Sequence, residues 1–292
     1  MADIFSWVWF LYQGWHFDQN MDFVDSNGNL FDYATQSFHY EYVQRQIKEF
    51  IFHRLCNRYR FLQCSIPSNA DGWVGDGLYH ARVSMTEDVL WNPNLLVIVP
   101  GSGEVSPGQW ARKLFTNGKR GQWGLATQFP YIDRALQEGW AVILCDPNHD
   151  EVGGRTLNTH ANHVCRVWED IIFRSSARRV MYIGFSVGTS SVLELYGQKK
   201  LEFRSRVKAI ALIDGEDGTT RADAWFWRHS FAFINSNRLR TAVNQELVQT
   251  NDHDCVPGMA VGGVFEYLKQ SRSWYQTMLL DERSCRAIHQ HQ

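Results

Sequence analysis

A serine between two glycines carries the clearest chemical signal in this sequence. The segment Gly184-Phe185-Ser186-Val187-Gly188 follows the apolar run Val180–Ile183 and leads directly into a segment with helical character. In this context the G-x-S-x-G pattern predicts a nucleophile elbow, a strained turn that raises the serine hydroxyl to the carboxyl edge of a parallel sheet. The chemistry would be acyl transfer with Ser186 as the nucleophile. A tight strand-to-helix turn with a capping serine is the alternative.

A loop of small residues precedes this segment in the chain. The apolar run Leu95–Val99 continues through Pro100 into Gly101-Ser102-Gly103. In a serine hydrolase, backbone amides of such a loop and of the residue after the nucleophile, here Val187, stabilise a tetrahedral oxyanion. A dinucleotide-binding turn is disfavoured because the third glycine of that motif is absent. No cofactor is expected.

Asp214 closes the apolar run Val207–Ile213 and follows Ser186 in the chain. Parallel strands end at the same edge of a sheet, so the carboxylate is expected beside the serine. Ser followed by Asp is also the order of the triad in hydrolases of the α/β type. An Asp at a strand end serves equally well in a turn or a helix cap, and both interpretations stay open.

The histidine that would accept the proton of Ser186 has to come from another element. A helix beginning near Thr159 and feeding the strand at 180–183 would start at the same sheet edge, which makes His160 and His163 candidates. His163 is the predicted base, and a hydrogen-bonded packing role is the alternative for both. A metal site on His160, His163 and Cys165 is disfavoured because that spacing spreads the ligands around the helix. The histidines ranked below His163 are His229, His253, His289 and His291.

The elements that must position these residues follow from the pattern of apolar segments. Short unbroken apolar runs are typical of strands buried on both faces, and they occur at 95–99, 140–145, 180–183 and 207–213. The last strand is expected near Val256–Val261. Helices are predicted after Ser106-Pro107-Gly108-Gln109, which matches a capping box, at 131–137 behind Pro130, and from Thr159 to Ile172.

The first third of the chain predicts smaller antiparallel pieces and one helix. Residues 23–25 and 29–31 flank Ser26-Asn27-Gly28, a tight hairpin turn. A surface helix is expected at 42–62 and short strands at 64–66 and 78–83. The predicted fold is therefore an α/β-hydrolase-like, mostly parallel sheet with helices on both faces and an N-terminal antiparallel hairpin extension.

Composition narrows the class of protein further. The 292 residues have 44% hydrophobic content and a formal net charge of −2, which favours one domain over 1–292, with a core at about 17–280, an arm at 1–16 and a tail at 281–292. The near-neutral charge disfavours a nucleic-acid binder, and no apolar run is long enough to span a membrane. Six scattered cysteines without a CxxC pair indicate neither a zinc ribbon nor a disulfide framework. The sequence predicts a soluble, intracellular protein without a bound metal.

Three further segments have both an ordinary and a functional interpretation. The aromatic segments 225–227 and 231–233 either form a lid above the sheet edge or pack in the core, and Trp7–Phe10 is either a packing arm or the contact of a homodimer. A local basic cluster either solvates a helix end or contacts phosphate or RNA. Its members are Lys199, Lys200, Arg204, Arg206 and Lys208.

The sequence resembles the Arb2 domain family, an α/β-hydrolase-like family that includes Argonaute-associated proteins and the C-terminal domain of some class II histone deacetylases. The resemblance extends from about Phe17 to Tyr275. It is carried by Leu96–Gly103, Gly108-Gln109-Trp110-Ala111-Arg112, Gly139–Asn148, His163–Trp168, Gly184–Gly188 and Ala211–Asp214.

The resemblance implies protein partners in Argonaute-type or histone-deacetylase-type complexes, in the nucleus and cytoplasm, with nucleic acid contacted only indirectly or weakly. Two departures bear on activity. Pro100 stands where relatives with a complete-looking site carry His. Relatives also place a histidine just after the last strand, whereas Gly262–Tyr267, which follows the strand expected at 256–261, contains no imidazole. The favoured interpretation is therefore a protein-interaction module on a degenerate serine-hydrolase scaffold, in a small-RNA or heterochromatin pathway. The alternative is an active serine hydrolase with Ser186, Asp214 and a relocated histidine.

Overall fold

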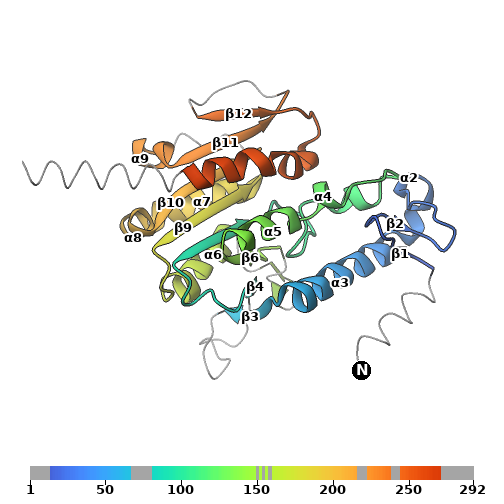
Figure 1. Cartoon of the computed structure of the whole chain (residues 1–292), viewed down its shortest axis with the longest axis horizontal. Helices are drawn as coiled ribbons and strands as arrows, with labels where there is room; N and C mark the ends of the chain where they lie inside the picture. The colour runs from blue at the N-terminus through green and yellow to red at the C-terminus, as the bar shows by residue number, and fades with distance from the viewer. Residues whose placement is uncertain are drawn as a thin grey trace, which may run out of the picture.

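An eight-stranded sheet runs through the centre of the molecule in the computed structural model, which describes residues 14–66, 81–148, 151–152, 155–156, 160–215, 222–237 and 244–270 (Figure 1). The strand order is β12-β11-β10-β9-β5-β6-β4-β3. The six strands from β12 to β6 run parallel, and β4 and β3 add an antiparallel edge. The strands are β3 (Leu62–Ile66), β4 (Ala81–Met85), β5 (Asn94–Val99), β6 (Ala141–Cys145), β9 (Arg179–Phe185), β10 (Val207–Ile213), β11 (Ser230–Asn235) and β12 (Gln245–Val248).

The four apolar runs all form central strands, as predicted. Successive side chains of a strand point to opposite faces, so one strand contributes to two cores. Leu96 and Ile98 of β5 belong to one buried cluster, and Leu95, Val97 and Val99 belong to the other. All five side chains are fully buried. This burial on both faces explains why the runs are almost entirely apolar, with Lys208 near the start of β10 as the charged exception.

Helices cover both faces of the sheet. The first cluster is completed by α3 (Tyr40–Tyr59), α5 (Phe129–Gln137) and a helix at 256–270, which lie together in front of the sheet in Figure 1. The second is completed by α6 (His160–Val167), the π-helical turn η3 (Trp168–Ile172), α7 (Val187–Gln198) and α8 (Lys200–Arg206). The predicted helices at 131–137 and 159–172 are thereby confirmed. No helix in the described part of the chain is long and apolar enough to cross a membrane.

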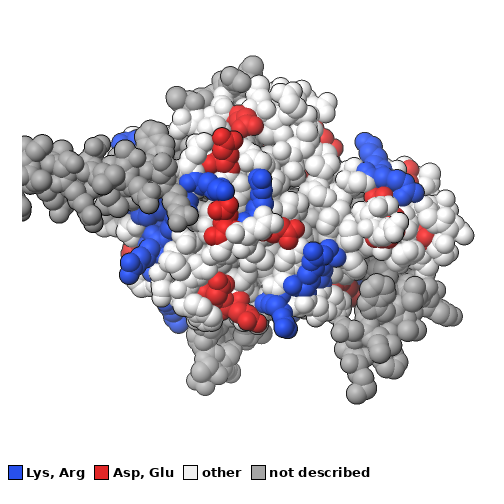
Figure 2. Space-filling model, in the orientation of Figure 1, with Lys and Arg blue, Asp and Glu red and all other residues white. Residues whose placement is uncertain are grey.

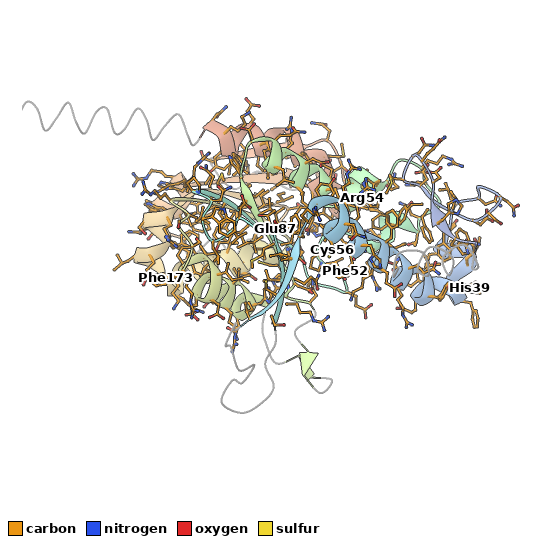
Figure 3. All side chains as sticks on the ribbon, turned by 60° about the horizontal axis from the view of Figure 1, so that its bottom comes forward. His39, Phe52, Arg54, Cys56, Glu87 and Phe173 are labelled. Atoms are coloured by element: carbon orange, nitrogen blue, oxygen red, sulfur yellow. The ribbon has the colours of Figure 1, made fainter. Side chains whose placement is uncertain are left out.

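The helix α3 is amphipathic at the expected spacing. Val43, Ile47, Ile51 and Leu55 recur every four residues and are buried against the sheet side, while the opposite face is exposed. Figure 3 labels Phe52, Arg54 and Cys56 in the C-terminal half of α3, and His39 just before its N-terminal end. The helix stops at Arg60, whose left-handed φ of 58° ends the hydrogen-bonded ladder.

The N-terminal turn forms as predicted, but its strand pairing differs. Gly28 has a φ of 80°, and its amide donates to Asp25. β2 (Phe23–Val24) pairs with β1 (His16–Phe17) in a separate two-stranded sheet, whereas the segment after the turn makes one bridge, between Val24 and Leu30. A second small sheet joins β7 (Glu151–Val152) to β8 (Arg155–Thr156).

The predicted capping box at Ser106 does not begin a helix. Pro107-Gly108 instead forms a β-turn, in which the Gln109 amide donates to the Ser106 carbonyl and Gly108 has a φ of 92°. A proline followed by a residue at positive φ is the signature of a type II turn, which glycine accepts without strain. A single 3-10 turn, η2 (Arg112–Phe115), follows, and further short helices lie at α2 (Tyr33–Gln36), η1 (Ser37–His39), α4 (Trp123–Ala126), α9 (Ala224–Arg228) and η5 (His253–Cys255).

The prediction of a last strand at 256–261 is wrong, because this segment begins the helix at 256–270. Val256, Ala260, Val264 and Leu268 are spaced by four residues and are all buried, which is helical periodicity. Three glycines within 256–270 obscured that helical pattern in the sequence. The last described strand is β12, whose half-buried, partly polar sequence gave only a weak signal.

Several predicted features lie outside the described residues, namely Trp7–Phe10, most of the arm, the start of the strand expected at 78–83, and the tail with His289 and His291.

Candidate active site

Ser186 occupies a strained turn between β9 and α7. Its φ of 54° and ψ of −121° lie in a region that residues with a side chain rarely adopt, as expected for an elbow. The Ser186 amide donates to the Ile213 carbonyl at 2.9 Å, and the Ser186 carbonyl accepts from the Thr189 amide and hydroxyl at 3.0 and 2.7 Å. These bonds hold the turn, and the residue stays partly exposed.

The two glycines of the motif are required by close backbone contacts. A Cβ at Gly184 would lie 2.9 Å from the Gly188 carbonyl oxygen, so the elbow itself leaves no room for a side chain there. A Cβ at Gly188 would lie 2.5 Å from the Val99 carbonyl oxygen at the end of β5. The start of α7 therefore packs directly against the neighbouring strand.

The loop at 101–103 lies beside the serine. A Cβ at Gly101 would come 3.1 Å from the Ser186 Cβ. The Gly101 carbonyl accepts from Asn148 Nδ2 at 3.0 Å and lies 3.4 Å from His160 Nε2. The structure thus fixes the Gly101 peptide next to Ser186. Whether the amides of Gly101, Ser102, Gly103 and Val187 bind an oxyanion stays a prediction.

Asp214 lies at the adjacent strand end with its carboxylate fully buried. Its φ of 41° is also left-handed, and the following Gly215 passes so close to α7 that a Cβ there would lie 2.0 Å from Thr189 Oγ1. Asn235 donates its amide to Oδ1 at 3.2 Å and its side-chain Nδ2 to both oxygens, at 3.1 and 2.9 Å. These donors stabilise the ionised carboxylate away from water.

His253 completes the arrangement. Its Nδ1 lies 2.6 Å from Asp214 Oδ2, and because a carboxylate can only accept, the imidazole donates this hydrogen bond. The neutral ring then carries its lone pair on Nε2, the tautomer that a general base needs. The imidazole also stacks on Phe185, the residue before Ser186, with ring centroids 4.7 Å apart. With 40% of its side chain exposed, it is accessible from solvent.

Ser186 and Asp214 therefore lie at neighbouring strand ends on the carboxyl edge of the sheet, and His253 reaches this edge through its contacts with Asp214 and Phe185. Among the described residues the serine hydroxyl makes no hydrogen bond to the imidazole, and such a bond commonly forms only when a substrate binds. The conclusion that no imidazole follows the last strand is wrong, since His253 follows β12 by five positions. The chain order Ser, Asp, His was the signal that could have identified it.

The structure does not support His163 as the base. Its side chain is fully buried, and Nε2 accepts a hydrogen bond from the Asp146 amide at 3.1 Å, so this lone pair already has a partner at the end of β6. His163 corresponds to the packing alternative. His160 connects α6 to α7 through Ser191 Oγ at 2.9 Å.

The remaining candidates have structural partners. Burial raises the pKa of the Cys165 thiol to about 11, which disfavours the thiolate that a metal site requires. Phe226 and Phe233 are buried, in agreement with the core alternative for the aromatic segments. In the basic cluster, Lys199 pairs with Glu169, Lys200 and Arg204 pair with Asp223, and Arg206 and Lys208 donate to backbone carbonyls.

Positive and negative side chains also alternate on the molecular face shown in Figure 2, without a continuous basic surface. This distribution agrees with the low net charge and gives no electrostatic support to nucleic-acid binding on that face.

Comparisons with known proteins agree with this architecture. No protein-family model matches the chain. The Cotranscriptional regulator ARB2A of Mus musculus is 24% identical over 325 residues, which cover 86% of this chain and 76% of that protein. The FAM172 family protein homolog Y75B8A.31 of Caenorhabditis elegans is 36% identical over 127 residues, or 41% of this chain and 38% of that protein.

Among solved structures, the histone deacetylase Clr3 matches with a TM-score of 0.52 and 18% identity, over 78% of this chain and 39% of the Clr3 chain. At this identity the match concerns the fold. Together with the ARB2A relatives, it confirms the resemblance derived from the sequence motifs. The chain therefore resembles the Arb2 family and has an α/β-hydrolase-like fold.

Proposed function

We propose that this chain is a serine hydrolase of the α/β type, in which Ser186 is the nucleophile, His253 the general base and Asp214 the residue that orients the base. The observation that carries the proposal is the 2.6 Å hydrogen bond from His253 to the buried carboxylate of Asp214. A partly exposed imidazole held by a buried acid, beside a strained serine, has the composition and chain order of a catalytic triad.

The proposed reaction is the hydrolysis of an ester. Ser186 Oγ attacks the acyl carbon as His253 Nε2 takes the hydroxyl proton, and the tetrahedral intermediate collapses when His253 returns that proton to the leaving alcohol. Water then attacks the acyl-enzyme, gives a proton to His253, and releases the acid as the proton returns to Ser186 Oγ. The amides of Val187 and of the loop at 101–103 are the proposed donors to the oxyanion.

Labelling with a fluorophosphonate probe tests this proposal. The probe forms a phosphoryl bond to an activated serine and releases fluoride, and mass spectrometry of the labelled peptide identifies the residue. We expect labelling at Ser186 that is lost in Ser186→Ala and reduced at least about a hundredfold in His253→Gln.

Matched controls are available on exposed surfaces. Ser205→Ala and His53→Gln remove a serine and an imidazole from the exposed sides of α8 and α3, and both should label like the wild type. Absence of labelling in the folded wild-type protein, or labelling that persists in His253→Gln, would contradict the proposal.

We also propose a regulatory role within a protein complex, which the names of the relatives support. A cotranscriptional regulator acts in the nucleus, so nuclear localisation is the compartment that this role favours, while the cytoplasm has no such support. The partners proposed are histone-deacetylase-type or Argonaute-type assemblies, in a heterochromatin or small-RNA pathway. A degenerate scaffold would carry this regulatory role without acyl transfer. Labelling of Ser186 would indicate an active hydrolase, and its absence would indicate a non-catalytic interaction module.

A further inference from the structure

A polar cavity of about 320 Å³ lies between α3 and the segment that carries Gln109 and Arg112. Gln44, Arg45 and Lys48 line it from α3, and Glu104 lines it from the loop after β5. Its volume is at the lower end of the range for small-molecule sites. Neither Ser186 nor His253 lines it, so the cavity is separate from the candidate active site.

Two buried side-chain atoms of residues that line this cavity have no hydrogen-bond partner among the described residues. Gln109 is 1% exposed, and its Oε1 accepts from the Ser106 amide at 3.0 Å, which leaves Nε2 unpartnered. Gln44 is 3% exposed, and its Nε2 faces the Arg112 carbonyl and Thr116 Oγ1, which leaves Oε1 unpartnered. Buried polar atoms are nearly always paired, so Gln109 Nε2 and Gln44 Oε1 are the donor and the acceptor that this cavity offers to a ligand.

The backbone around Gln109 is rigid. Gln128 is fully buried, its Oε1 accepts from the Gly108 amide at 3.0 Å, and its Nε2 donates to the Gln109 carbonyl at 2.9 Å. Gly108 fits against α3 so closely that a Cβ would lie 2.6 Å from Ile51 Cγ2. The Gln109 amide group is therefore held in position before any ligand arrives.

The charges around the cavity favour an anion. Arg45, Lys48 and Arg112 contribute three positive charges, against the two negative charges of Glu41 and Glu104. Arg112 Nη1 lies 2.6 Å from Glu104 Oε2, and its guanidinium lies over the Tyr40 ring at 5.4 Å. These contacts neutralise Glu104 and fix Arg112 on one side of the opening, while Arg45 and Lys48 are on the exposed face of α3.

We propose that this cavity binds a small molecule that carries an oxyanion, phosphate or carboxylate, next to a hydroxyl group. The oxyanion accepts hydrogen bonds from Gln109 Nε2 and from the cationic side chains, and the hydroxyl donates to Gln44 Oε1. The proposal is independent of acyl transfer at Ser186, since it needs binding only.

Isothermal titration calorimetry with three probes tests the site on the full-length chain. The probes are inorganic phosphate, glycerol 3-phosphate and glycolate, of which the last two carry a hydroxyl beside the anion. We expect saturable binding of at least one hydroxylated probe, about tenfold tighter than that of inorganic phosphate, because its separate carbon-bound hydroxyl can donate to Gln44 Oε1 while the anion stays on Gln109 Nε2 and the cationic side chains. The stronger of the two identifies phosphate or carboxylate as the preferred anion.

Two substitutions then locate the site. Gln109→Glu replaces the free donor by a carboxylate and should weaken binding at least about tenfold, while Gln137→Glu, an exposed position at the end of α5, should leave it unchanged. Because a buried change can impair folding, Arg45→Glu on the exposed surface provides an independent test with the same expected loss. No saturable binding of any probe, or binding that Arg45→Glu leaves intact, would overturn the proposal.

Discussion

Lys113 Nζ lies 2.7 Å from Asp254 Oδ2, so an ion pair ties the residue after His253 to η2. The same ammonium group lies 3.5 Å from the carboxylate of Asp252, the residue before His253. The hydrogen bond to Asp254 raises the pKa of Lys113, so the ammonium stays charged at neutral pH. Both neighbours of the proposed base are thus held by one side chain.

Lys113→Met should slow fluorophosphonate labelling of Ser186 by about tenfold, because His253 loses its two lateral supports and samples unproductive positions. The free energy of unfolding should change by less than about 1 kcal/mol, since Lys113 is 60% exposed and such pairs are weak. Labelling rates and urea denaturation measure the two effects. Lys119→Met, at an exposed lysine of the next loop, is the control, and equal labelling rates for both variants would exclude a positioning role.

Asp214→Asn keeps the shape of the side chain and removes its charge. An amide at this position can donate to His253 Nδ1 and so stabilise the wrong tautomer, which would place the proton on Nε2. We expect the labelling rate of Ser186 to fall by about 10³ to 10⁴, the scale seen for triads of this type. Circular dichroism should show a folded protein. A fall of less than tenfold would mean that Asp214 acts only in the strand-end turn.

Gly188→Ala and Gly197→Ala place the same methyl group at two positions of α7. At Gly188 it would lie 2.5 Å from the Val99 carbonyl oxygen, whereas nothing lies within 4 Å at Gly197. Gly188→Ala should lower the free energy of unfolding by about 2 to 3 kcal/mol through overpacking. Gly197→Ala should raise it by up to about 1 kcal/mol through higher helix propensity. Denaturant titration of the two variants shows whether glycine at position 188 is required by its close contact with Val99 or is merely the residue usual in the motif.

His229 is expected to make the folded protein less stable in mild acid. Burial lowers the pKa of its imidazole from the usual 6.5, and the ring stacks on Trp225 with centroids 4.0 Å apart. The unfolded chain therefore binds a proton at a higher pH than the folded protein does. Its contribution is complete above pH 6.5 and is lost as the pH falls through the unfolded and then the folded pKa. His229→Phe keeps an aromatic ring at this position and should flatten the dependence of unfolding free energy on pH between about 7 and 5; an unchanged slope would assign the acid sensitivity elsewhere.

The sequence predicted the elements whose apolar pattern is continuous. The strands β5, β6, β9 and β10 are buried on both faces, so their central residues are apolar, with Lys208 near the start of β10 as an exception. Their parallel order brings Ser186 and Asp214 to one edge. The elbow was also predictable from its G-x-S-x-G pattern. The close contacts at Gly184 and Gly188 exclude any residue with a side chain, so the fold requires both glycines of the pattern.

The base was missed for reasons of local geometry. β12 is four residues long and half polar, so the stronger apolar pattern at 256–261 predicts the last strand there, although this segment begins a helix. That prediction puts His253 before the final strand instead of after it. His163 had the favourable helix position, but the Asp146 amide that occupies its lone pair comes from β6, a contact that no sequence spacing shows.

Asn148 contacts both the loop beside Ser186 and the polar cavity. Its Nδ2 holds the Gly101 carbonyl beside Ser186, and its side chain also forms part of the wall of the polar cavity (Figure 1 shows β6, which ends just before it). A compound that displaced this amide from within the cavity would release Gly101 without contacting Ser186. Inhibitors of acyl transfer can accordingly be sought among compounds that bind the polar cavity, an allosteric site at which they would not compete with the ester substrate.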